Sequence, residues 1–303
     1  MKKISDYLPA MPTEQQEKIN NKIQTLLKDP YIYQFMSNYQ LSNEVLLRSL
    51  SQILAFKEDR DYFLMHGTSK QLPGYEPRLE LVHGEISVKY YQTKADFQAQ
   101  KEKEMKKSAV YIDIPKASRK ASFDQLKGNQ EKLAVVQEIY TFINQYLQNK
   151  EGYHQGIYLY GSYGVGKTYL MGALANELAK HQVKTVFVNI ATFIAQLKGE
   201  FSQPQNKITQ KLDQLKKADV LILDDIGMET MSEWVRDEIL GVILQYRMQE
   251  ELPTFFTSNL SMKALERHLA ETRQEQNDLR AKRLMERISY LAKEMTVSGQ
   301  SLR

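Results

Sequence analysis

The pattern of apolar and polar residues changes its period repeatedly between residues 123 and 303. Short apolar runs bounded by glycine, proline or polar residues predict strands, and apolar positions repeated every three or four residues predict helices between them. The five predicted strands cover residues 156–160, 183–189, 220–224, 254–258 and 295–298. Because strands and helices alternate, we predict an α/β domain with a five-stranded parallel sheet that is covered on both faces.

Residues 1–93 show a different pattern. Apolar residues at helical spacing predict helices over residues 13–29 and 42–65, and a turn with proline and glycine then leads to a predicted hairpin around His83-Gly84-Glu85. No recognisable catalytic motif occurs in this stretch of sequence. We therefore expect a small, mostly helical domain that serves as an interaction module.

Residues 94–122 join these two regions and are rich in lysine. The stretch from Lys94 to Lys120 holds eight Lys or Arg and four Asp or Glu, an excess equal to the net charge of +4 of the whole chain. Such an excess favours contact with nucleic acid phosphates, although a solvated linker explains it equally well. We predict an interaction module over 1–93, a basic linker over 94–122 and a catalytic domain over 123–303.

Composition narrows the possible chemistry. The length of 303 residues predicts about two domains, and a hydrophobic content of 42% is ordinary for globular chains. The absence of cysteine excludes disulfides, cysteine zinc sites and thiol nucleophiles. The sequence has neither the start of a signal peptide nor an apolar run long enough to span a bilayer, so we expect a cytoplasmic protein without membrane contact.

The strongest chemical signal is a complete G-x-x-x-x-G-K-T loop between the predicted strand 156–160 and a predicted helix over 168–180. Its glycines let consecutive backbone N–H groups point at phosphate oxygens, and the positive end of the helix dipole faces the same anion. Lys167 supplies a charge for the β- and γ-phosphates, and the Thr168 hydroxyl is suited to Mg²⁺. The residues predicted to bind ATP are Gly161, Ser162, Tyr163, Gly164, Val165, Gly166, Lys167 and Thr168.

Polar residues also end two other predicted strands. Asp224 and Asp225 follow an apolar run, and the carboxyl ends of parallel strands meet at one edge of the sheet. We predict that Asp224 holds Mg²⁺ and that Asp225 polarises the attacking water. Asn259 follows the strand 254–258, where it would orient that water or contact the γ-phosphate. The alternative is that Ser258 and Asn259 only cap the next helix.

Arg283 and Arg287 lie four residues apart on one face of a predicted amphipathic helix. An arginine that reaches the γ-phosphate of a neighbouring subunit would stabilise the charge that develops during phosphoryl transfer. The alternative is that both arginines are solvated or paired with Glu286.

The order of these motifs resembles the replicative helicase loaders of the DnaC/DnaI group. These proteins are AAA+ ATPases related to the DnaA initiator and to the IstB transposition ATPase. The resemblance rests on the phosphate loop, Leu-Asp-Asp-Ile-Gly at 223–227, Pro-Thr-Phe-Phe-Thr-Ser-Asn at 253–259 and Arg-Leu-Met-Glu-Arg-Ile at 283–288. It is strong over residues 123–303, and the N-terminal module and basic linker are most similar to the DnaI type of Gram-positive bacteria.

This resemblance implies a function and a set of roles. The chain would be an ATP-dependent loader that uses ATP and Mg²⁺, binds the hexameric replicative helicase through its N-terminal module, contacts single-stranded DNA and self-associates through its ATPase domain. The implied roles are Walker A for residues 161–168, Walker B for Asp224 and Asp225, sensor I for Asn259, arginine finger for Arg283 and nucleotide contact for Arg287.

The sequence departs from the group in two respects. Some DnaI-like proteins carry a Cys/His zinc site in the N-terminal module, but here only His66 and His83 are present, so we predict no zinc. The segment after Asn259 is also too short for a full helical lid. We therefore expect loose nucleotide binding until a neighbouring subunit completes the site.

Two other functions are compatible with a phosphate loop. An IstB-like transposition ATPase would share the core and act on DNA, but the N-terminal module and basic linker argue against it. A metabolic kinase would need a pocket for a small substrate and usually a lid, and the sequence indicates neither.

Overall fold

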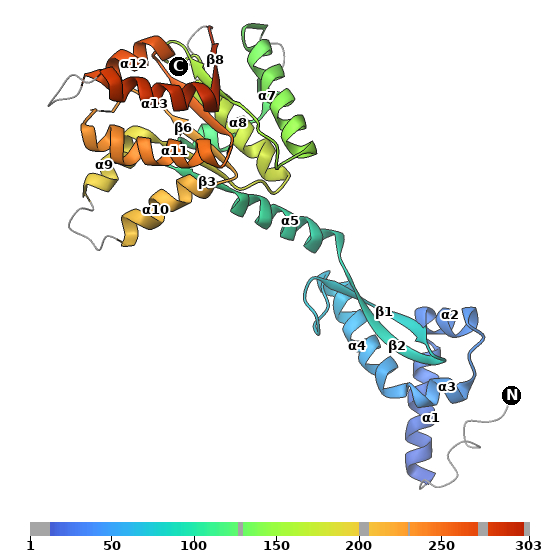
Figure 1. Ribbon diagram of the computed structural model, residues 1–303. Coiled ribbons are helices and arrows are strands. Elements are labelled where there is room, and N and C mark those ends of the chain that lie inside the picture. The colour runs from blue at the N-terminus through green and yellow to red at the C-terminus, as the bar shows by residue number, and fades with distance from the viewer. Residues whose placement is uncertain (1–12, 127–129, 200–205, 230, 272–277, 300–303) are drawn as a thin grey trace. The chain divides into compact units, whose positions relative to one another are not determined.

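The computed structural model describes residues 13–126, 130–199, 206–229, 231–271 and 278–299. The chain divides into two compact units, residues 1–102 and 103–303, each with a hydrophobic core of its own (Figure 1). The division falls within helix α5 (Lys94–Ser108).

The first unit consists of four helices and a hairpin, and residues 1–12 of the predicted module lie outside the described part of the chain. Asp29-Pro30 ends the first helix, as predicted, but it also begins a helix that was not predicted, because proline is well suited to a first helical turn. The elements are α1 (Thr13–Leu27), α2 (Pro30–Asn38), α3 (Asn43–Arg48), α4 (Leu50–His66), β1 (Tyr75–Val82) and β2 (Glu85–Gln92).

The hairpin lies where it was predicted. His83 and Gly84 form its two-residue turn with φ angles of 52° and 82°, so both have the left-handed conformation that matches the twist of the flanking strands. One face of the hairpin is apolar, and its Leu79 and Ile86 join Ile53 and Phe56 of α4 in the core. The hairpin therefore closes a core that the helices alone would leave open.

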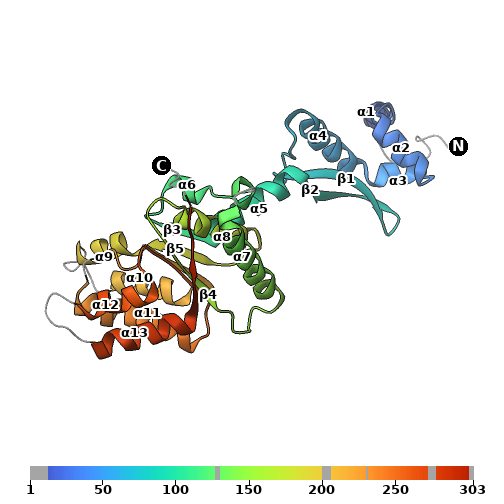
Figure 2. The ribbon, with the colours of Figure 1, turned by 90° about the horizontal axis from the view of Figure 1, so that it is seen from above.

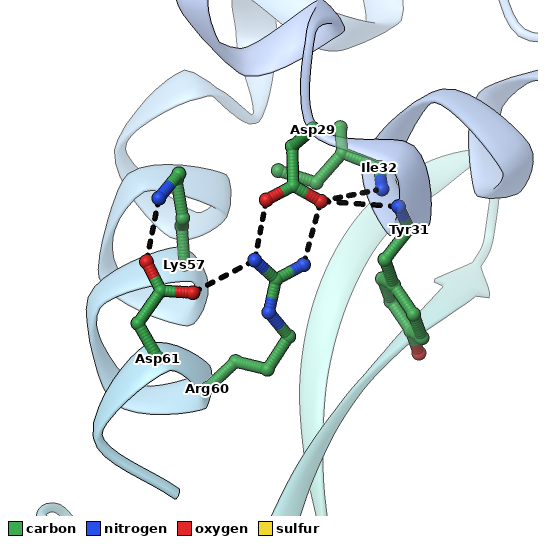
Figure 3. Close-up of polar contacts among 6 residues, drawn as sticks. All are labelled: Asp29, Tyr31, Ile32, Lys57, Arg60 and Asp61. Atoms are coloured by element: carbon green, nitrogen blue, oxygen red, sulfur yellow. Dashed lines mark hydrogen bonds and ion pairs between the residues drawn. The ribbon is translucent and has the colours of Figure 1, made fainter. Parts of the chain in front are cut away.

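A buried ion pair joins α2 to α4 (Figure 3). The Asp29 carboxylate accepts hydrogen bonds from the backbone N–H groups of Tyr31 and Ile32 at 3.1 and 3.3 Å, which caps α2. The same carboxylate accepts two bonds from the Arg60 guanidinium, one of 2.7 Å from Nη1. Hydrogen bonding to Arg60 lowers the pKa of Asp29 to about 2.

We expect Asp29→Ala to destabilise the first unit by about 3 kcal/mol, because it removes a helix cap and leaves the Arg60 charge buried without its main partner. Asp61→Ala is the matched control, since Asp61 also contacts Arg60 but is 38% exposed, and its loss is expected to cost less than about 1 kcal/mol. Urea unfolding of residues 1–102 measures both values. Equal losses would contradict the assigned role.

The pKa of Asp29 also predicts the pH dependence of this stability. Because the folded-state pKa lies below the ordinary value of 3.8, the contribution is complete well above pH 4 and is lost as the pH falls toward 2. The Asp29→Ala chain should show a smaller loss of stability than the parent over that window.

The second unit is a parallel sheet of six strands in the order β3-β5-β6-β7-β4-β8. Its strands are β3 (Ala109–Ile112), β4 (Gly156–Tyr160), β5 (Thr185–Asn189), β6 (Val220–Asp224), β7 (Thr254–Ser258) and β8 (Ala292–Thr296). Its helices are α6 (Lys116–Arg119), the 3₁₀ turn η2 (Phe123–Leu126), α7 (Gln130–Gln148), α8 (Lys167–Lys180), α9 (Ile190–Gly199), α10 (Asn206–Lys217), the π-helix η3 (Trp234–Leu240), α11 (Gly241–Gln249), α12 (Met262–Ala270) and α13 (Asp278–Leu291).

Helices cover both faces of this sheet (Figure 1, Figure 2). Side chains of α7 and α8 form one hydrophobic cluster, and those of α9, η3, α11, α12 and α13 form the other. Successive strand residues enter opposite clusters, as Phe255 and Phe256 do. The prediction of an α/β domain with both faces covered is confirmed.

The predicted number of five strands is wrong, because β3 is a sixth strand that pairs with β5 at the edge of the sheet. It comes from residues 94–122, which were predicted to be a linker and which also contain α5. The apolar run Ala109-Val110-Tyr111-Ile112 is only four residues long and follows a lysine-rich stretch. The surrounding charges therefore favoured the prediction of a linker over that of a strand.

Other boundaries differ by a few residues. The predicted helix over 232–249 contains the π-helical segment η3 before α11, and the last strand begins directly after α13 at Ala292. Within the residues that the structure describes, no helix is both long enough and apolar enough to cross a membrane.

Candidate nucleotide-binding site

The loop between β4 and α8 is shaped by close contacts of its backbone. A side chain at Gly161 would come within 2.2 Å of the Val297 carbonyl oxygen, so only glycine fits there. Gly166 has a φ of 97°, a conformation that side chains disfavour, and it directly precedes α8. Val165 is buried in the core and anchors the loop. The first backbone N–H groups of α8 are thereby placed at the rim of a cavity.

Lys167 is held inside this loop. Its Nζ donates to the carbonyl oxygens of Gly161 and Ser162 at 2.8 and 2.9 Å and to Asn259 Oδ1 at 2.7 Å. Burial lowers the pKa of Lys167, and the charges of Asp225 and Asp224 oppose that shift. The ammonium group is therefore positioned by three acceptors before any phosphate arrives.

Asn259 reaches the site because of the strand order. It follows β7, and β7 lies between β4, which leads into the loop, and β6, which ends at the acids. Its Oδ1 accepts from Lys167, and its Nδ2 donates to the Met228 sulfur at 3.3 Å. The amide thus faces the loop, as its predicted role requires, and does not cap the next helix, which Ser261 does.

Asp224 is almost fully buried at the end of β6. Its Oδ1 accepts hydrogen bonds from the Thr168 hydroxyl at 3.0 Å and from the Thr257 hydroxyl at 2.6 Å. Burial and the neighbouring Asp225 charge raise the pKa of Asp224 to about 6, while its hydrogen bonds act in the opposite direction. A buried carboxylate beside a hydroxyl is an oxygen donor set that suits a hard cation such as Mg²⁺.

Asp225 follows in an uncommon backbone conformation, with a φ of 57°. Its backbone N–H donates to Thr257 Oγ1 at 2.9 Å. The side chain lines the same cavity as Lys167 and Asn259. The two carboxylates therefore have different surroundings, with Asp224 buried and Asp225 at the cavity wall.

The cavity at the phosphate loop has a volume of about 460 Å³. Most of the residues predicted to bind nucleotide or metal line it, whereas Gly161, Ser162 and Val165 shape the loop from behind. Several lining residues were not predicted from the sequence. Asn189 ends β5, so the rule about strand ends would have found it. The others are Thr192 in α9, and Asp113, Pro115, Ala117, Ser118 and Tyr169.

The arginines predicted to act on nucleotide are not in this cavity. Arg283 and Arg287 line a separate cavity of about 310 Å³ together with Arg236 and Arg280. Arg287 donates to the Gly241 carbonyl oxygen at 3.0 Å. Arg283 is exposed and makes no hydrogen bond or ion pair with another described residue. Within the described part of the chain, this guanidinium is thus available to a group of another molecule.

Asp237 lines the same cavity and binds two of its arginines. It accepts two bonds from the buried Arg236 at 2.9 and 3.0 Å and one from Arg280 at 2.6 Å. The hydrogen bond from Arg236 is the main reason why the pKa of Asp237 is lowered.

A six-stranded parallel sheet with a phosphate loop, paired acids after β6 and an asparagine after the intervening strand defines an ATP-binding protein of the AAA+ class. Two family models match the chain, "IstB-like ATP binding protein" over residues 94–303 and "Primosomal protein DnaI N-terminus" over residues 1–90. The chain belongs to the DnaI family of replicative helicase loaders.

Individual relatives agree with this assignment. The chain is 33% identical to the replicative helicase loader DnaI of Bacillus subtilis over 298 residues, which covers 95% of this chain and 94% of that protein. A putative primosome component from Streptococcus pyogenes is 38% identical, with a TM-score of 0.55 over 67% of this chain and 100% of its own. A DnaI crystal structure is 37% identical, with a TM-score of 0.54 over 66% of this chain and 100% of its own.

Proposed function

We propose that this loader binds Mg-ATP and hydrolyses it as a switch while it holds the replicative helicase and helps to place it on single-stranded DNA. The observation that carries the proposal is the convergence of Lys167, Asn259 and the two acids on one cavity. These groups come from the ends of three neighbouring strands, which is where a nucleotide binds in this kind of sheet.

The side chains have distinct roles in this proposal. Lys167 neutralises the β- and γ-phosphates, and Asn259 keeps the ammonium in place and faces the γ-phosphate. Asp225, at the cavity wall, orients the attacking water and accepts its proton. Thr168 and Asp224 would hold Mg²⁺, which offsets phosphate charge when bound.

We further propose that Arg283 acts on the nucleotide of a neighbouring copy. Among the described residues that line the phosphate-loop cavity, Lys167 is the only one with a positive charge. Arg283 lines a separate cavity and makes no hydrogen bond or ion pair with another residue that the structure describes. Self-association through the ATPase unit would bring the two together, and Arg287 then supports the arginine cavity rather than its own nucleotide.

The first unit is proposed to bind the helicase. It matches the DnaI N-terminal family model, whereas the second unit matches a model shared with IstB-like proteins. This difference favours a loader over the alternative of a transposition-partner ATPase. Single-stranded DNA is proposed to contact the ATPase unit, because residues 278–303 hold six Lys or Arg and only three Asp or Glu.

Co-purification with the replicative helicase of the same organism tests this division of roles. We expect the full chain and residues 1–102 to retain the helicase, and residues 103–303 to bind it at least about tenfold more weakly while still binding nucleotide. The first unit should keep its affinity in a chelator, because no described residues form a cluster of three metal-ligating side chains. The proposal would be contradicted if residues 103–303 bound the helicase as tightly as the full chain and residues 1–102 did not bind it.

A further inference from the structure

Thr257 is a fully buried residue of β7 that contacts both acids at the end of β6. Its hydroxyl lies 2.6 Å from Asp224 Oδ1 and 2.9 Å from the backbone nitrogen of Asp225. Its backbone carbonyl oxygen accepts from the Ile226 N–H at 2.9 Å. One residue therefore binds three consecutive residues of the neighbouring strand end.

The direction of each hydrogen bond follows from the chemistry. The backbone N–H of Asp225 can only donate, so Thr257 Oγ1 accepts from it, and the single hydroxyl hydrogen is left for the carboxylate of Asp224. A bond from a hydroxyl to an ionised acceptor is short and strong in a buried site. Asp224 Oδ1 is thus held between Thr257 and Thr168, which lies 3.0 Å away on its other side.

The contact with Asp225 restrains a backbone that is otherwise unfavourable. Asp225 has a φ of 57°, and such conformations persist where the surroundings hold them. The two hydrogen bonds that Thr257 accepts from the N–H groups of Asp225 and Ile226 supply that restraint. They determine the direction in which the Asp225 side chain leaves the strand, toward the cavity.

We propose that Thr257 is a positioning residue for nucleotide hydrolysis, because its hydroxyl orients the Asp224 carboxylate and holds the backbone of Asp225. The inference rests on the proposed ATPase function and extends it to a residue outside the cavity lining. Thr257 does not line the cavity, so it acts through the two acids.

The neighbouring residue provides a matched control. Ser258 is equally buried in the same strand, but its hydroxyl donates to the Ile226 carbonyl oxygen at 2.7 Å and accepts from the Leu260 N–H at 3.1 Å. It makes no side-chain contact with either acid among the described residues. Loss of this hydroxyl removes buried hydrogen bonds of the same kind without touching Asp224 or Asp225.

The test compares Thr257→Val, Thr257→Ser and Ser258→Ala in the full chain with the helicase present. Thr257→Val keeps the shape of the side chain and removes the hydroxyl, and we expect kcat to fall about 10- to 100-fold with a smaller rise in KM for Mg-ATP. Thr257→Ser should retain most of the activity because it keeps the hydroxyl. Ser258→Ala should also stay near the parent.

A binding measurement separates this proposal from the proposed hydrolysis. Titration with a fluorescent ATP analogue, in EDTA and in Mg²⁺, should show that Thr257→Val keeps the affinity in EDTA and loses most of the gain that Mg²⁺ gives the parent. This comparison remains valid if the parent chain hydrolyses no ATP, a result that would refute the ATPase function alone. If Thr257→Val fails to fold, Thr257→Ala against Thr257→Ser makes the same comparison.

Three outcomes would overturn the proposal. The first is an unchanged kcat and Mg²⁺ response in Thr257→Val. The second is an equal loss in Thr257→Ser, which keeps the hydroxyl, because the effect would then follow any change of the side chain at this position rather than loss of the hydroxyl. The third is an equal loss in Ser258→Ala, which would assign it to general disturbance of β7.

Discussion

Lys167→Ala is expected to weaken ATP binding by about 100-fold or more, because truncation of a buried, hydrogen-bonded charge costs about 2–5 kcal/mol and each 1.4 kcal/mol is a factor of ten. Lys167 supplies the only positive charge among the described residues that line the phosphate-loop cavity. Its ammonium is also held by three acceptors, so binding requires little reorganisation. No neighbouring side chain can replace it.

Titration with a fluorescent ATP analogue measures this loss. Lys180→Ala is the matched control, since Lys180 lies at the far end of the same helix, is exposed and pairs with Glu177. We expect this variant to bind like the parent. An unchanged affinity in Lys167→Ala would refute the assignment of the loop, whatever the control does.

The residues at the site were predictable because their positions depend on local rules. The phosphate loop is continuous in sequence, Asp224 ends a predicted strand, and Asp225 and Asn259 each follow one. In a parallel sheet, strand ends of the same polarity meet at one edge, so no knowledge of register was needed to bring these residues together. The same rule would have added Asn189, which ends β5.

Thr257 was not predictable, because its role depends on the pairing of two particular strands. A threonine in an apolar strand is ordinary in sequence, and only the register of β6 against β7 places its hydroxyl between the two acids. The edge strand β3 was not predicted for a related reason. A run of four apolar residues among charged ones does not indicate a strand unless its pairing with β5 is known.

The hydrogen-bond partners of Arg247 and Arg60 could not be predicted from the sequence either. Arg247 resembles a surface cation of α11, yet it is fully buried and donates to Thr254 Oγ1 and to four backbone carbonyl oxygens. These acceptors belong to the end of α10, to the residue that follows it and to the start of β7, so the sequence separates them widely. Arg60 is similar, because its partner Asp29 lies 31 residues away.

Arg283→Ala is expected to lower the ATPase rate by about 10³ while leaving ATP binding by the single chain unchanged. The guanidinium lines a cavity separate from that of the phosphate loop, so its removal does not alter the chain's own binding site. Lys282→Ala is the matched control on the same helix, since Lys282 is exposed and lines a different cavity. It should keep the parent rate.

A mixture of two inactive variants then tests action between subunits. Arg283→Ala still binds ATP but supplies no arginine, and Lys167→Ala supplies the arginine but binds ATP at least about 100-fold more weakly. Where the two meet in the productive orientation, one complete site forms, so the mixture should recover part of the parent rate although neither variant is active alone. If each variant is inactive and the mixture stays inactive at concentrations where the parent self-associates, Arg283 does not act on a neighbour's nucleotide. Its separate cavity would then have to serve another anionic group.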